Sequence, residues 1–146
     1  MWFIIVVGVF FFLRFFSSRE LFNLDRFFLF SVVALANWIV FFSWALFYNR
    51  DASKSAGQVT RIVTDGPYRL VRHPIYSADI FLAWGVFVAF PRVNVLASAV
   101  WLTVVMFGWM ILEENALKDL FDGEYVGYMK KTPRLIPDYL RLLNRN

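Results

Sequence analysis

The residues with the clearest chemical potential lie in one short segment, Gly66–Tyr76, directly before an apolar stretch. The segment reads Gly-Pro-Tyr-Arg-Leu-Val-Arg-His-Pro-Ile-Tyr and contains two arginines, two prolines, two tyrosines and the single histidine of the chain. Ionisable groups at the edge of a membrane segment are costly and usually serve a function. The segment therefore predicts a binding site at a membrane boundary.

His73 and Pro74 predict where a helix begins. The residue before a proline is pushed out of the helical region, and proline is favoured at the first helical position. We expect His73 at the N-cap, near free backbone N–H groups that attract anionic or electron-rich ligand groups. Tyr76 and Asp79 follow on the same helix face, where one ligand could meet all three side chains. The alternative is that Arg72 and His73 only anchor the helix among lipid headgroups.

A pair of carboxylates, Glu113 and Glu114, directly follows a long apolar span. Membrane topology does not require carboxylates at a cytoplasmic helix exit, where positive residues are favoured. They could bind ribose hydroxyls, balance a cationic cofactor, or form ion pairs with Arg69 or Arg72. The sequence leaves these three roles open.

The chain after the paired glutamates predicts a surface helix followed by a turn. Apolar and aromatic residues recur at helical spacing from Leu117 to Tyr128, which indicates an amphipathic helix on the membrane surface, interrupted near Gly123. Prolines at both ends of Pro133–Pro137 prevent a regular helix and predict a turn back over the central loop. Arg134 would then face the same site.

Apolar stretches must position these residues. A membrane-spanning helix needs about 20 mainly apolar residues, and 60% of this chain is hydrophobic. We expect four spans, at about 2–16, 27–48, 75–90 and 93–112, with the last two forming a helical hairpin. For the first span the alternative is a signal peptide, but a basic leading region and a small-residue cleavage site are missing. The expected fold is an all-α integral membrane protein with one domain, residues 1–146.

The charges then predict an orientation. Basic residues gather in the central loop, 49–73, and in the tail, 113–146. By the positive-inside rule both segments and both termini face the cytoplasm, so the two polar segments can form one site. Because the basic residues lie beside apolar spans, the net charge of +4 indicates membrane lipids as partners instead of nucleic acid.

Several chemistries are excluded by composition. The chain has no cysteine and one histidine, which rules out disulfides, thiolate metal sites, a cysteine nucleophile and a histidine-rich metal cluster. We therefore expect no metal. G-x-G-x-x-G, P-loop and G-x-S-x-G patterns are absent as well, so any cofactor must be held by the interfacial segments.

Taken in order, the motifs resemble those of the isoprenylcysteine carboxyl methyltransferase family and, more loosely, the membrane phospholipid methyltransferases. They are G-P-Y-R-x-x-R-H-P-x-Y at Gly66–Tyr76, E-E-x-x-L-x-x-x-F-x-x-x-Y-x-x-Y at Glu113–Tyr128, and P-R-x-I-P at Pro133–Pro137. Together they cover roughly the C-terminal half of the chain. The resemblance implies an integral membrane methyltransferase that binds S-adenosylmethionine outside any Rossmann fold.

The resemblance also implies the site residues. Arg134, Glu114 and Arg69 are the candidates for catalysis, with Arg134 either in the pocket or on the substrate carboxylate. The arginines available to fix a carboxylate in two-point contact are Arg69, Arg72 and Arg134. Two positions depart from the family pattern: Ala78 stands where glycine is frequent, and no arginine shortly precedes the paired glutamates. The second departure leaves open which cation orients the carboxylates. The residues implied to line the cofactor pocket are Tyr68, His73, Pro74, Tyr76, Glu113 and Glu114.

The expected reaction is transfer of a methyl group to a lipophilic acceptor, most concretely carboxyl O-methylation of an isoprenylcysteine-like substrate. A carboxylate acceptor is already ionised at neutral pH and needs no strong general base. Phospholipid N-methylation is the first alternative and would need a base, such as Glu114 or His73. The others are an NADPH enzyme of the sterol-reductase type, whose motif typically has asparagine in place of Pro74, and a non-enzymatic protein that binds anionic lipids or a partner.

Overall fold

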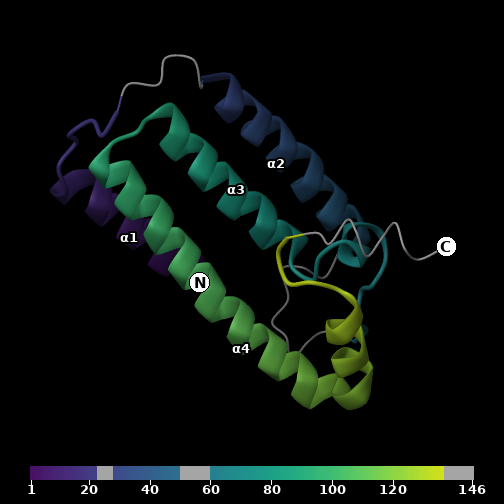
Figure 1. Ribbon diagram of the computed structural model, residues 1–146. Helices are drawn as coiled ribbons and strands as arrows, with labels where there is room; N and C mark the ends of the chain where they lie inside the picture. Colours follow the sequence, from purple (N-terminus) through teal and green to yellow (C-terminus); the bar gives the residue numbers. More distant parts are fainter. Residues whose placement is uncertain (23–27, 50–59, 137–146) are drawn as a thin grey trace. The chain divides into compact units, whose positions relative to one another are not determined.

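The computed structural model describes residues 1–22, 28–49 and 60–136, and within them it contains helices and no strand (Figure 1). Its helices agree with the predicted ones: the ends of the first three lie within one residue of the expected bounds. The prediction of an all-α fold is confirmed for these residues. The elements are α1 (Trp2–Phe15), α2 (Phe28–Tyr48), the 3-10 helix η2 (Gly66–Arg69), α3 (Pro74–Ala89) and α4 (Val93–Lys131).

The chain forms two compact units, and the boundary between them falls inside α2, α3 and α4. The first unit comprises Met1–Val40 and Ala78–Ile111, and the second comprises Phe41–Ser77 and Leu112–Asn146. The predicted polar motifs, Gly66–Tyr76 and the paired glutamates, all belong to the second unit.

Among the described residues, two helices are long and apolar enough to cross a membrane, Leu29–Tyr48 in α2 and Val93–Lys131 in α4. Only 11% and 22% of the residues in their most apolar windows are buried, so most of these side chains are at least partly exposed. The helices α1 and α3 are apolar but have only 14 and 16 residues. The span count of four therefore stays a prediction.

Small residues bring α2 and α3 together in the first unit. A Cβ atom on Gly85 would lie 2.4 Å from the Cβ of Ala34, and Ser31 Oγ donates a 2.8 Å hydrogen bond to the Gly85 carbonyl. Such close approach through small residues is typical of helices in membranes. Trp38 Nε1 donates to Asp79 Oδ1 at 2.7 Å, so the carboxyl expected beside His73 bonds to α2.

The predicted hairpin is present, since the short connection 90–92 joins α3 to α4. The segment after α1 pairs with this connection: Leu21 N donates to the Pro91 carbonyl and Val93 N to the Arg19 carbonyl. Gly8 of α1 leaves room for the indole of Trp101, whose Nε1 donates to the Ile4 carbonyl. These contacts assemble α1, α3 and the first part of α4 into one unit.

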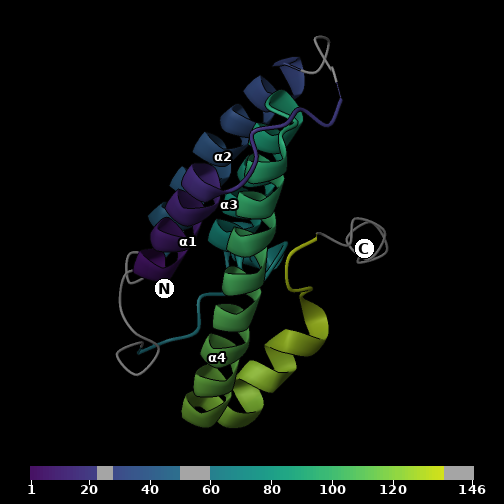
Figure 2. The ribbon, with the colours of Figure 1, turned by 90° about the vertical axis from the view of Figure 1, so that its left-hand side faces the viewer.

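In the second unit α4 bends sharply, and its last turns run back beside the preceding ones (Figures 1 and 2). The bend lies at Asp122, with φ 40° and ψ −123°, next to the predicted interruption at Gly123. A non-glycine residue at positive φ is uncommon and fits a chain reversal. The predicted loop residues 50–59 and the tail from Pro137 onward lie outside the described residues.

Candidate active site

The start of α3 is formed as the sequence predicts. His73 is the N-cap, because its carbonyl accepts the first helical hydrogen bond, from Ser77 N at 2.9 Å, and Pro74 is the first helical residue. Both residues are buried. Just before them, Gly66 has φ +59°, and a Cβ atom there would lie 2.7 Å from the ring of Tyr48. Glycine therefore lets η2 pack against the end of α2.

A segment after α4 lies across the start of α3, and we name Thr132–Leu135 the strap. Its four successive carbonyls all accept hydrogen bonds from the start of α3. The Thr132 carbonyl accepts from Arg72 Nη1 at 2.8 Å, and the Pro133 carbonyl from Arg72 N at 2.8 Å. The Arg134 and Leu135 carbonyls accept from His73 N and Ser77 Oγ. The predicted turn back over the central loop is confirmed for these residues.

Glu114 lies at the centre of the cluster, with a side chain only 1% exposed. Arg134 contacts it with two nitrogens, Nη2 at 2.6 Å from Oε2 and Nε at 3.1 Å from Oε1. His73 Nε2 lies 3.1 Å from Oε1. Because a carboxylate only accepts hydrogen bonds, this contact requires the imidazole proton on Nε2.

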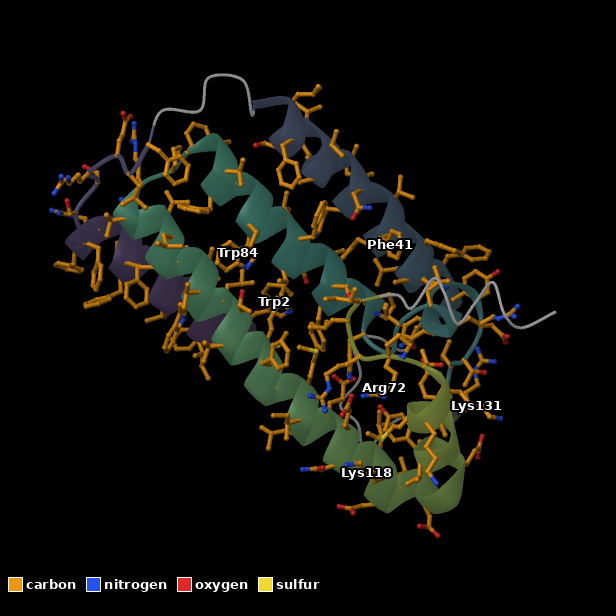
Figure 3. All side chains as sticks on the ribbon, viewed as in Figure 1. Trp2, Phe41, Arg72, Trp84, Lys118 and Lys131 are labelled. Carbon is orange, nitrogen blue, oxygen red and sulfur yellow. The ribbon has the colours of Figure 1, made fainter. Side chains whose placement is uncertain are left out.

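Arg72 is the second guanidinium on Glu114 and is almost fully enclosed, with 9% of its side chain exposed. Its Nε and Nη2 both lie 3.0 Å from Glu114 Oε1. Its Nη1 donates to the carbonyls of Met129 and Thr132, at the end of α4. In Figure 3, Arg72 lies beside these last turns of the helix. Three of its five N–H donors thus make hydrogen bonds, and Nη2 makes an ion-pair contact.

The surroundings of Glu114 fix its charge. Burial raises the pKa of this carboxyl, but hydrogen bonds from His73 and Arg134 and the charge of Arg72 outweigh burial and lower the pKa from 4.5 to about 2. The hydrogen bond to Glu114 in turn raises the pKa of Arg134. Two guanidinium groups, those of Arg72 and Arg134, thus share this one buried carboxylate.

Glu113 has a different environment from its neighbour. About 35% of its side chain is exposed. Tyr76 donates a 3.0 Å hydrogen bond from its hydroxyl to Glu113 Oε2, and His73 Nδ1 lies 4.0 Å from the same oxygen. The rings of His73 and Tyr76 stack with centroids 5.5 Å apart. Glu113 therefore offers a partly exposed carboxylate beside two aromatic rings.

Three buried or half-buried tyrosines complete this region. Tyr128 donates a 2.6 Å hydrogen bond from its hydroxyl to the Tyr68 carbonyl, and Asn49 Nδ2 donates to the Tyr68 hydroxyl at 3.2 Å. Burial raises the pKa values of Tyr68, Tyr125 and Tyr128, and the Glu114 charge adds to this effect at Tyr125. These hydroxyls stay protonated near neutral pH and can donate hydrogen bonds.

Most residues proposed from the sequence meet in this cluster. Direct contacts join His73, Tyr76 and Arg134 to the paired glutamates, as given above. Pro74 is buried at the start of α3, and Tyr68 is linked to the end of α4 through Tyr128.

Arg69 does not join the cluster. It is exposed in η2 and has no hydrogen bond or ion pair to another described residue. Arg72 was one of the possible ion-pair partners but not one of the catalytic candidates. Together with Arg134 it supplies the cations that orient Glu114, a point that the sequence left open. The sequence signal for Arg72 is its place before His73 in the motif at Gly66–Tyr76.

Comparison with known proteins shows the family of the chain. A model of the phospholipid methyltransferase family matches residues 24–124, more than half of the chain. The chain belongs to the phospholipid methyltransferase family. The match confirms the resemblance to this group of membrane methyltransferases.

Two methyltransferases from other organisms are similar in sequence to the chain. Methanethiol S-methyltransferase 1 from Bradyrhizobium diazoefficiens is 33% identical over 116 residues, which cover 72% of this chain and 40% of the relative. Protein-S-isoprenylcysteine O-methyltransferase B from Arabidopsis thaliana is 35% identical over 80 residues, which cover 53% of this chain and 40% of the relative. The chain thus spans about 40% of the length of each. No solved structure matches it significantly.

Proposed function

We propose that the protein is a membrane methyltransferase that uses S-adenosylmethionine and methylates the carboxylate of a lipophilic acceptor of the isoprenylcysteine type. The observation that carries the proposal is the cluster at the start of α3. There Glu114 is buried and paired with two arginines, and it lies beside the partly exposed Glu113 and Arg134. Membership in the phospholipid methyltransferase family supports the reaction class.

The residues present fit the proposed methyl donor. S-adenosylmethionine carries positive charge at its sulfonium and amino groups, and it offers ribose hydroxyls and a carboxylate. Glu113 has exposed carboxylate surface for a cationic group or for hydroxyls. Arg134 uses only Nε and Nη2 on Glu114, and one third of its side chain is exposed, so other N–H donors can meet a carboxylate. When bound, the cofactor would supply an electrophilic methyl group.

The state of Glu114 favours an acceptor that is already ionised. Glu114 is buried among His73, Arg72 and Arg134, and its pKa is about 2. Such a carboxylate is a poor base for removing a proton from an ammonium or a thiol. A carboxylate acceptor loses no proton when it is methylated. The chain then has to hold acceptor and methyl group in line and to exclude water, which are the effects that enclosed sites supply best.

We place this reaction at the cytoplasmic side of the membrane. The apolar helices α1 and α3 would complete four spans with α2 and α4, and the basic loop and tail would face the cytoplasm by the positive-inside rule. A lipophilic acceptor would reach the cluster from the bilayer. The charged residues begin at Glu113, directly after the apolar part of α4.

The test is the identity of the labelled product. The purified protein in lipid nanodiscs is incubated with methyl-labelled S-adenosylmethionine and one acceptor at a time. The acceptors are N-acetyl-S-farnesylcysteine, phosphatidylethanolamine and methanethiol, and the products are identified by mass spectrometry. The proposal expects a labelled methyl ester of the farnesylated acceptor. Label only in the phospholipid or in the thiol would overturn the choice of acceptor. Stabilisation by NADPH and not by S-adenosylhomocysteine would favour the reductase, and no response to either would favour a lipid- or partner-binding protein.

A further inference from the structure

Arg72 contacts three separate parts of the second unit. Its guanidinium contacts Glu114 on one edge and the carbonyls of Met129 and Thr132 on the other. Its backbone N–H also donates to the Pro133 carbonyl. One residue thus joins the start of α3, the end of α4 and the strap.

Arg134 depends on the same contacts for its position. It lies in the strap, two residues after Thr132, and its side chain reaches Glu114 from there. Arg72 contacts both the strap and Glu114, the two structures that hold Arg134. A change at Arg72 should therefore move Arg134, although no direct contact between the two arginines is needed.

The two guanidinium groups differ in what they can offer a ligand. Arg72 is 9% exposed, and its guanidinium makes three hydrogen bonds and an ion-pair contact of Nη2 with Glu114. Arg134 is 33% exposed, and within the described part of the chain only its Nε and Nη2 have partners. The exposed outer edge of Arg134 therefore has N–H donors that can bind an anion.

From these contacts we propose that Arg72 is a positioning residue, which fixes the strap and Glu114 so that Arg134 presents its outer edge to the carboxylate of a ligand. The proposal rests on the proposed function, which supplies two ligands with a carboxylate: the amino-acid part of the cofactor and the lipophilic acceptor. Lysine cannot replace Arg72, because a single ammonium cannot contact Glu114 and two carbonyls on opposite edges.

A double-mutant cycle tests this role. Dissociation constants are measured in nanodiscs for the wild type, Arg72→Gln, Arg134→Gln and the double variant. Arg61→Gln, a change of an exposed arginine in the same unit, is the control. S-adenosylhomocysteine is compared with methylthioadenosine, which lacks the amino-acid carboxylate, and N-acetyl-S-farnesylcysteine is compared with its methyl ester. These pairs distinguish the two sources of the carboxylate.

We expect Arg134→Gln and Arg72→Gln each to weaken binding of one carboxylate ligand by about tenfold, equivalent to about 1.4 kcal/mol. Neither change should alter binding of the matching ligand without a carboxylate by more than about twofold. In the Arg134→Gln background, Arg72→Gln should add less than about twofold, because the group that it positions is gone.

Equal losses for both members of a ligand pair, or a full effect of Arg72→Gln in the Arg134→Gln background, would overturn the role of Arg72. If Arg72→Gln does not fold, Arg72→Lys is measured in the same cycle with the same expectations. A wild-type protein that binds neither nucleoside contradicts the proposed function itself. Nucleoside binding without coupling between the arginines contradicts only the role of Arg72.

Discussion

Replacing Glu114 with glutamine tests whether this carboxylate holds the cluster together. The change removes the negative charge that Arg72 and Arg134 both contact. The amide nitrogen of the glutamine would also point N–H donors at the N–H donors of a guanidinium. A pKa lowered from 4.5 to about 2 means that the fold favours the ionised carboxyl. Since one pKa unit equals about 1.4 kcal/mol, this preference is about 3 kcal/mol. Removing one partner of a buried ion pair typically costs about 3–5 kcal/mol, which agrees.

The assay is the free energy of unfolding in lipid bicelles, followed by circular dichroism, for the wild type and Glu114→Gln at several pH values. The folded-state pKa lies below the unfolded one, so the stabilisation is complete above about pH 4.5 and is lost as the pH falls toward 2. We expect Glu114→Gln to lose about 3 kcal/mol at pH 7, and the difference from the wild type to shrink to about 1 kcal/mol at pH 3.

The matched control for this experiment is Glu113→Gln. Glu113 is the same type of residue as Glu114 and directly precedes it in α4, but its side chain is 35% exposed. We expect this variant to lose less than about 1 kcal/mol, because partly exposed charge interactions contribute little to stability. Equal losses in the two variants, or a difference between wild type and Glu114→Gln that stays constant from pH 7 to pH 3, would show that the Glu114 carboxylate does not hold the cluster together.

Two other changes test the packing that supports the site. Gly66→Ala should lower the unfolding free energy by at least about 1 kcal/mol, since the residue has φ +59° and the new Cβ would lie 2.7 Å from the Tyr48 ring. Gly127→Ala, where no atom lies within 4 Å of the new Cβ, should be neutral or slightly stabilising, and a loss equal to that of Gly66→Ala would contradict the packing at η2. Trp38→Phe should cost about 1–3 kcal/mol, because Asp79 Oδ2 already lacks a partner among the described residues and Oδ1 would lose its own. Thermal unfolding would measure each change, and an unaltered melting temperature for Trp38→Phe would exclude a stabilising role for this hydrogen bond.

Local sequence rules predicted much of the fold. His73-Pro74 fixed the start of α3, the prolines after Lys131 fixed the turn of the strap, and the bend in α4 lies next to the predicted interruption at Gly123. Each of these features depends on residues close together in the chain, where backbone preferences decide the outcome. The helix bounds followed from the apolar stretches for the same reason.

The division of roles within the site could not be predicted in this way. Successive residues on a helix point about 100° apart, so only one of the paired glutamates can face the interior, and the sequence does not show that it is Glu114. Likewise the sequence does not show which of Arg69 and Arg72 contacts Glu114. The choice depends on η2, which leaves Arg69 exposed, and on the strap, which meets Arg72.

The most direct test of the proposed function is calorimetric binding of S-adenosylhomocysteine to the purified protein in nanodiscs. We expect saturable binding by the wild type and by Arg61→Gln. Glu113→Gln should bind at least tenfold more weakly, equivalent to about 1.4 kcal/mol, with little change in its melting temperature. Binding that is undetectable in the wild type, or equally tight in Glu113→Gln, would contradict a cofactor site at the start of α3.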